Sequence, residues 1–264
     1  MPHGCCFFHS SQNRGGWVWG GRADSPEIRA WESLSDAIIG ASEKAPLACA
    51  ICETRKEKRF CLAVHGRICP VCCGTEREVT LDCPAECPYL QQARRHEASR
   101  EPVGAELMKL FPQVRLAEDL PHRLEPLIME LGFALARAAH GQPALYDRDL
   151  MAALTALATS YETLVGSGLV YDAPTANLAH QAVIDGLQRS IAGYRETERR
   201  QIGYSRLRDS ELLQVIVFLL RLAAARTSGR PRSRAFIDLL SEQFPQHEGV
   251  IASPGDPSSR IILP

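Results

Sequence analysis

The fold of this chain depends on one cysteine-rich stretch, CAICETRKEKRFCLAVHGRICPVCCGTEREVTLDCPAEC, which spans residues 49–87. Eight of the ten cysteines of the 264-residue chain lie in this stretch. It carries few large apolar side chains, and a fragment of about 40 residues with so little apolar surface hardly folds without cross-links or metal. We therefore expect this stretch to fold around metal ions.

The rest of the chain favours metal binding over disulfide formation. The first twenty residues lack the basic start and the apolar run of a signal peptide, which predicts a cytoplasmic protein with reduced thiols. Clustered cysteines in a reducing compartment more often bind metal than form disulfides. The longest apolar stretch, residues 212–225, is shorter than the roughly 20 residues that span a bilayer, so no membrane segment is predicted.

The candidate ligands of the stretch come in four pairs. Two pairs have the Cys-x2-Cys spacing, which brings two thiolates to one ion, one pair combines Cys with His, and the last is Cys-x3-Cys. Eight such ligands match the number needed for two closed tetrahedral zinc sites. The predicted ligands are, pair by pair, Cys49 and Cys52, Cys61 and His65, Cys69 and Cys72, and Cys83 and Cys87.

This order of ligands resembles the cross-brace arrangement of the RING and MYND-like zinc fingers. The resemblance implies that the first and third pairs hold one ion and that the second and fourth pairs hold the other. Cys73 is a spare thiol that can replace His65 or Cys72, and His96 is a further alternative ligand. The last pair leads into a predicted helix that starts at Pro88, an arrangement similar to the end of treble-clef fingers.

Downstream of the cysteines, apolar residues recur at helical spacing in five stripes. The connections between the stripes are short, which favours a helical bundle. The fourth stripe is apolar nearly all round, so we expect it at the centre of the bundle. The stripes comprise Leu120, Leu124, Leu127, Leu131 and Leu135, ended by Gly141; Leu150, Leu154, Leu157, Tyr161 and Leu164, ended by Gly166; Ile184, Leu187, Ile191 and Tyr194; residues 212–222; and Phe236, Leu239, Leu240 and Phe244.

These patterns divide the chain into four parts. Residues 1–46 are predicted to be a largely disordered arm with one short helix, and residues 246–264 a flexible tail. Residues 47–100 form the Cys-rich zinc-binding module, and residues 101–245 form the helical bundle. The predicted fold is therefore mainly α, with a small zinc-stabilised finger module followed by a bundle of about five helices.

Two features indicate a bacterial origin. Only four of the 30 basic residues are Lys, a bias typical of GC-rich coding. The runs CPVCCGTERE (residues 69–78), CPAECPYL (residues 83–90) and GRPRSRAF (residues 229–236) are similar to an uncharacterised family of bacterial Cys-rich proteins. This resemblance implies no activity.

The sequence favours a non-catalytic role. It has no P-loop, no complete dinucleotide-binding glycine pattern and no nucleophile elbow. Zinc sites made only of Cys and His are typically structural. We therefore expect the finger and the helical domain to present an interaction surface to a protein partner, whose identity the sequence leaves open together with the oligomeric state. A thiol redox enzyme is an alternative, because Cys-x2-Cys also serves thiol–disulfide exchange.

Nucleic-acid binding, as in a regulatory protein, is the other alternative. The net charge of −1 gives no overall attraction to nucleic acid, so only local groups of basic residues support this hypothesis. Contacts from such groups to phosphates would make binding depend on salt. The two groups are Arg55, Lys56, Lys58 and Arg59 in the cysteine-rich stretch, and Arg226, Arg230, Arg232 and Arg234 before the last predicted helix.

Overall fold

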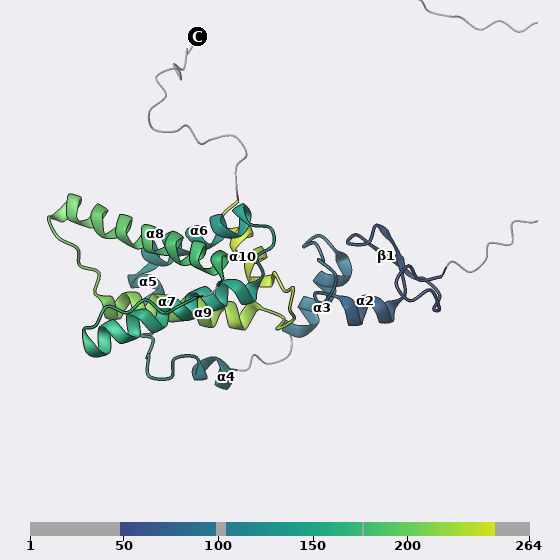
Figure 1. The fold of residues 1–264 in the computed structure, drawn as a ribbon, viewed down its shortest axis with the longest axis horizontal. Coiled ribbons are helices and arrows are strands. Elements are labelled where there is room, and N and C mark those ends of the chain that lie inside the picture. Colours follow the sequence, from purple (N-terminus) through teal and green to yellow (C-terminus); the bar gives the residue numbers. More distant parts are fainter. Residues whose placement is uncertain (1–47, 99–103, 176, 246–264) are drawn as a thin grey trace, which may run out of the picture. The chain divides into compact units, whose positions relative to one another are not determined.

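The computed structural model describes residues 48–98, 104–175 and 177–245 (Figure 1). The arm and the tail predicted at the two ends of the chain lie outside these residues. Within the described ranges the chain has nine helices and one two-stranded sheet. The predicted fold class, mainly helical with a small cysteine-rich module before the bundle, is therefore confirmed.

The finger, defined here as residues 48–98, contains a short hairpin followed by two helices. The hairpin is antiparallel, and Cys61 at the end of its first strand lies opposite Gly66. Strands of three residues are too short to show an alternating pattern, so the hairpin cannot be predicted from the sequence pattern. The elements are β1 (Arg59–Cys61), β2 (Gly66–Ile68), α2 (Pro70–Glu76) and α3 (Pro88–Ala98), the last beginning at the predicted proline.

The bundle, residues 104–245, follows the predicted stripes closely. Its last five helices correspond to the five stripes, and α9 packs along α7 while also contacting α4, α6 and α10. Because α9 is buried on most of its circumference, the central position predicted for the fourth stripe is confirmed. The helices are α4 (Gly104–Lys109), α5 (Leu120–Arg123), α6 (Glu125–Gly141), α7 (Asp147–Ser167), α8 (Leu178–Ile202), α9 (Asp209–Arg226) and α10 (Ala235–Gln243).

The first predicted helix of the bundle is interrupted in the structure. Its stripe begins at Leu120, but Leu124 has non-helical backbone angles (φ −114°, ψ 22°) and separates α5 from α6. Pro126, in the first turn of α6, cannot donate a backbone hydrogen bond, and in a continuous helix its ring would clash with the preceding turn. A proline is tolerated at a helix start but not inside a helix, so the prediction of one continuous helix was wrong.

Two glycines in the left-handed region end the long helices α7 and α8. Gly168 (φ 72°) donates its N–H to the Leu164 carbonyl at 2.8 Å, and Gly203 (φ 86°) does the same to Arg199. The predicted end of α7 at Gly166 is therefore two residues too early. A residue with a side chain is strained at such angles, which is why glycine is common at this position.

A buried carboxylate fixes the N-terminus of the last helix. Asp147, the first residue of α7, has no exposed surface and accepts hydrogen bonds from the Ser233 hydroxyl at 2.7 Å and from the Phe236 and Ile237 N–H groups. The first N–H groups of a helix have no partner within the helix. Asp147 supplies that partner from a different helix, and so ties α10 to α7.

A buried guanidinium holds the segment between α4 and α5 against the bundle. Arg221, on the central helix α9, donates to the carbonyl oxygens of Leu110, Phe111 and Val114 at 3.0–3.1 Å. The guanidinium has five N–H donors in a fixed plane, which suits a ring of carbonyl acceptors. A loop without regular hydrogen bonds thereby obtains partners for three carbonyl groups.

Replacing Arg221 by Leu should lower the free energy of unfolding by about 2–3 kcal/mol, because three buried or partly buried carbonyl groups lose a charged donor. Urea denaturation of the full chain followed by circular dichroism measures this change. Arg226→Leu is the matched control, because Arg226 lies exposed on the same helix and should change the stability by less than about 0.5 kcal/mol. Equal effects of the two substitutions would contradict the role given to Arg221.

The finger is fastened to the bundle through a network centred on Glu78, which we call the Glu78 network. Glu78 is 2% exposed, and its carboxylate accepts from the Arg94 guanidinium at 3.0 Å and from the Ser228 hydroxyl at 2.8 Å. Arg94 also donates to Asp238 of α10 at 2.7 Å. The Arg232 N–H donates to the Glu78 carbonyl at 2.8 Å. The partly buried ion pair between Arg94 and Asp238 thus joins the finger to the bundle, and the buried Glu78 holds Arg94 in place within the finger.

Two further arginine contacts extend this connection. Arg230 donates to the carbonyl oxygens of Gly74 and Arg77, at 3.0 and 2.6 Å, near the end of α2. Arg232 pairs with Asp82 at 2.7 Å, and Asp82 also accepts from the Tyr146 hydroxyl. The loop between α9 and α10 therefore contacts the finger at several points.

None of the helices in the described ranges combines the length and the apolar character needed to cross a bilayer.

Candidate metal centre

The first pair of cysteines lies in a tight turn just before β1. The Cys49 N–H donates to the Arg55 carbonyl at 2.9 Å, and the Glu53 N–H donates to the Cys49 carbonyl at 2.8 Å. These bonds close the turn, and Glu53 adopts a positive φ of 54° within it. The turn carries the side chains of Cys49 and Cys52 on the same side, as the Cys-x2-Cys spacing predicts.

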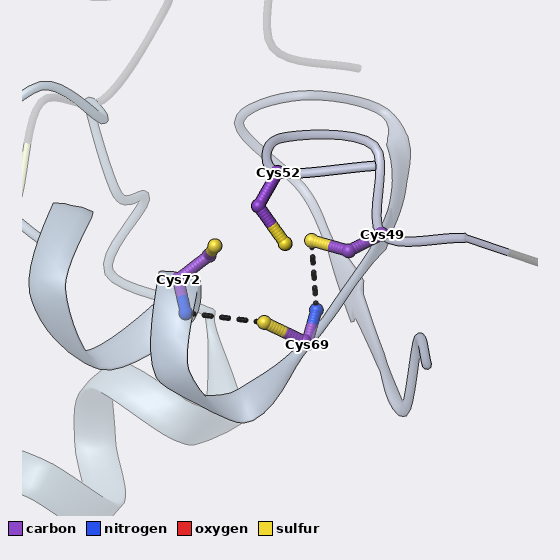
Figure 2. Close-up of side chains that lie close together, drawn as sticks. All are labelled: Cys49, Cys52, Cys69 and Cys72. Atoms are coloured by element: carbon purple, nitrogen blue, oxygen red, sulfur yellow. Dashed lines mark hydrogen bonds between the residues drawn. The ribbon is translucent and has the colours of Figure 1, made fainter. Parts of the chain in front are cut away.

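The second pair lies where the chain leaves β2 and enters α2. Cys69 is the N-cap residue of α2, and Pro70 occupies the first helical position. The Cys72 N–H donates to the Cys69 sulfur at 3.3 Å, and the Cys69 N–H donates to the Cys49 sulfur at 3.1 Å (Figure 2). Backbone N–H groups therefore already surround these sulfurs with partial positive charge.

The four sulfurs converge from the turn and from the start of α2 (Figure 2). The Sγ atoms of Cys49, Cys52, Cys69 and Cys72 all lie within 4.8 Å of one another. An ideal tetrahedron with metal–sulfur distances of about 2.3 Å separates its sulfurs by about 3.8 Å, so the observed spacing suits a tetrahedral ion. This four-cysteine group, which the cross-brace resemblance implied, can hold a metal ion.

Two of the four thiols, Cys52 and Cys72, differ strongly in acidity. Hydrogen bonds from Thr54 and from the Arg55 N–H lower the pKa of Cys52 to about 5. Burial raises the pKa of Cys72 to about 12, and its contacts with the other three sulfurs add to this effect. Four thiolates packed this closely repel one another, so a cation is what allows all of them to ionise.

Arg55 lies at the four-cysteine site, although its sequence context suggested only a basic group for nucleic acid. Its guanidinium hydrogen-bonds to the Cys69 sulfur, and this contact, together with the nearby Cys52 and Cys69 sulfurs, raises the pKa of Arg55. An ion with four thiolate ligands carries a net charge of about −2, and a guanidinium beside it offsets part of that charge. The signal for this role in the sequence is that Arg55 follows the ligand Cys52 by only three residues.

The ligand atoms of the other predicted residues do not form a second group that is as closely spaced as the first. Within the described residues, only the group of four cysteines in Figure 2 meets this spacing. Cys61 and Cys87 are buried and Cys83 is half-buried, whereas His65 is exposed in the turn of the hairpin with a φ of 49°. The predicted second set of ligands stays a prediction.

The two alternative ligands lie in different surroundings. Cys73 is buried beside the first site, and its sulfur accepts hydrogen bonds from Arg59 at 3.4 Å and from Arg77 at 3.8 Å. His96 lies on the exposed side of α3, where it lines a surface pocket with Arg59 and Tyr89. All eight cysteines of the finger are free thiols.

The structure gives most of the candidate phosphate-binding arginines partners within the chain. Arg230 and Arg232 join the finger to the bundle, as described above, and Arg234 donates to the carbonyl oxygens of Pro143 and Leu145. In the first group, Arg55 and Arg59 contact cysteine sulfurs, while Lys56 and Lys58 are exposed. A count of charges cannot separate such internal contacts from contacts with a ligand.

Fold and site together define a mainly helical protein with a finger whose four cysteines can hold a metal ion. Comparisons with protein-family models, with curated proteins and with solved structures found no match to this chain. The resemblance to the bacterial Cys-rich family and the bacterial origin therefore stay predictions.

Proposed function

We propose that this chain is a non-catalytic zinc protein of the cytoplasm, in which a structural ion shapes the finger and in which the finger and the helical domain present a surface to a protein partner. The single observation that carries the proposal is the group of four cysteine sulfurs within 4.8 Å of one another. Thiolate ligands in a tetrahedral arrangement favour zinc over the harder cations.

The donor set supports a structural ion. All four positions of a tetrahedron are filled by the sulfurs of Cys49, Cys52, Cys69 and Cys72, so no position is left for water or substrate. Catalytic zinc sites instead keep one position open. Three of the four side chains are buried, which limits access of solvent to the ion.

Exposed apolar side chains on the finger support a binding role. Phe60 and Val71 are each about half exposed, and Leu62 and Val64 of the hairpin and its turn are exposed as well. Exposed apolar side chains are a common feature of protein-binding surfaces. The Glu78 network keeps this surface fixed with respect to the bundle, and a preorganised surface costs less conformational entropy on binding.

Metal analysis of the purified full chain tests the zinc part of the proposal. Inductively coupled plasma mass spectrometry should find at least one zinc per chain, and Cys69→Ser should remove one ion. Val71→Ser, on the same helix but exposed, is the control that should keep its zinc. A wild-type protein with less than about half an equivalent of zinc after expression with added zinc would refute the structural site.

A comparison of variants tests the binding part. Proteins retained by the immobilised full chain should be lost when Phe60 is replaced by Ser, and should be kept when Leu178 is replaced by Ser. Leu178 is a suitable control because it is an apolar side chain that is 87% exposed at the start of α8, in the bundle. Equal retention by both variants would contradict a binding surface on the finger.

A further inference from the structure

We propose that the finger binds a second metal ion through the sulfurs of Cys61, Cys73, Cys83 and Cys87, with Cys73 in the place that the sequence pattern gives to His65. This inference rests on the proposed metal-binding function of the finger and adds a site with its own ligand set. Four thiolates from four different segments would then hold the ion: the end of β1, α2, the loop after α2 and the start of α3.

A shared buried cluster and electrostatic interactions place these thiols in the same part of the finger. Cys61 and Cys73 belong to the same buried cluster, and each is 8% exposed. Cys83, which is half-buried, interacts electrostatically with Cys87 and with Cys61. Cys61 thus shares a buried cluster with Cys73 and interacts with Cys83, which in turn interacts with Cys87, so the four thiols lie in the same part of the finger.

The direction of Cys73 separates it from the first site. Successive residues of an α-helix point about 100° apart around the helix axis, so adjacent cysteines on α2 face different neighbours. Cys72 joins the first group of sulfurs, whereas Cys73 contacts the side chains of Arg59 and Arg77. One helix can in this way supply a ligand to each of two ions.

The charges around Cys73 suit an ion with four thiolates. Such a centre carries a net charge of about −2, and hydrogen-bond donors to the sulfurs are typical of the surroundings of metal ligands. Arg59 and Arg77 both donate to the Cys73 sulfur, and the Arg59 guanidinium lies 4.5 Å from the centroid of the Tyr89 ring, which fixes its position. Arg55 has the corresponding position beside Cys69 in the first site.

His65 is a poorer ligand than its spacing suggests. It is exposed in the turn of the hairpin, whereas Cys61 and Cys73 point into the buried part of the finger. Among the described residues, the sulfurs of this second set are spaced more widely than those of the first site, which all lie within 4.8 Å of one another. Binding of the ion therefore requires the thiols to close around it, and rotation of cysteine side chains between staggered χ1 rotamers supplies this movement.

Native mass spectrometry of the zinc-loaded full chain tests the proposal. The experiment uses a Cys5→Ser, Cys6→Ser background, so that the eight cysteines of the finger are the only thiols. We expect two ions per chain in this background, one ion in Cys73→Ser and two ions in His65→Ala. His65→Ala replaces an exposed side chain, so it is expected to fold whichever residue binds the ion.

Cobalt loading of the same proteins identifies the ligands. Thiolate-to-cobalt absorption grows with the number of sulfur ligands, so a second site of four thiolates should give His65→Ala the spectrum of its parent. The assignment would be overturned if His65→Ala lost one ion, or if Cys73→Ser still bound two ions. If the parent protein bound one ion and its Cys69→Ser variant bound none, the second site would be refuted and the first site would stand. A parent that binds no ion would refute the proposed function itself.

Discussion

Removal of metal with a chelator should unfold residues 48–76 of the finger and leave helices α6 to α9 folded. The buried cluster of the finger consists of five cysteines and Ile68, so we expect ligation of sulfur, and not burial of apolar surface, to hold it together. In isolated finger peptides, structural zinc contributes about 10–16 kcal/mol to folding. The bundle instead buries a continuous cluster of leucine, isoleucine, valine and alanine side chains, which needs no ion.

Hydrogen exchange of the full chain, followed by mass spectrometry, measures this difference segment by segment. Amides of residues 48–76 should lose protection after chelation and regain it when zinc is restored, while α6 to α9 keep theirs throughout. Cys69→Ser should behave as the chelated protein does, and Val71→Ser as the zinc-loaded one. Protection of residues 48–76 that survives chelation would show that the finger folds without an ion.

The second large effect is expected from Glu78. Glu78→Ala should lower the free energy of unfolding by about 3 kcal/mol, because the partly buried Arg94 loses a buried carboxylate partner and the Ser228 hydroxyl loses its acceptor. Removing one partner of a buried ion pair costs roughly 3–5 kcal/mol when the other charge is left unpaired. Arg94 keeps its ion pair with Asp238, so the cost should lie at the lower end of that range. The substitution should also raise hydrogen exchange in the loop between α9 and α10.

Urea denaturation gives the stability change, and Glu97→Ala is the matched control. Glu97 is an exposed acidic residue on the same helix as Arg94, so its removal should cost less than about 0.5 kcal/mol. Arg94→Ala combined with Glu78→Ala completes a double-mutant cycle, in which the double variant should be more stable than the sum of the single effects implies. Additive effects would show that the two side chains do not interact.

The sequence predicted the parts of this molecule that depend on regular spacing. The two Cys-x2-Cys pairs predicted the four sulfurs that the structure brings together, and apolar residues at helical spacing predicted the last five helices. In both cases the pattern is local, so it can be read without knowledge of the fold. The break before α6 was also readable, because Pro126 excludes a continuous helix.

Contacts between distant segments could not be predicted in this way. Glu78 and Ser228 are 150 residues apart, and nothing in either local sequence connects them. The arginines of residues 229–236 illustrate the same difficulty, because their charge favoured nucleic acid while their carbonyl and carboxylate partners lie within the chain. Similarly, the hairpin and α2 are too short for a periodic pattern, although they position the cysteines.

The Glu78 network has a practical consequence for anyone who divides this protein into fragments. A cut in residues 99–103 looks harmless, since it separates a metal-binding part from a helical one. Such a cut would strip the bundle of Arg94, the cationic partner of Asp238, whose pKa is already raised by burial. In the helical fragment, Asp238 would be a partly buried acid without its partner, and the arginines of the loop between α9 and α10 would lose their contacts with the finger. Precipitation of that fragment would therefore indicate the loss of these contacts and not an unstable bundle.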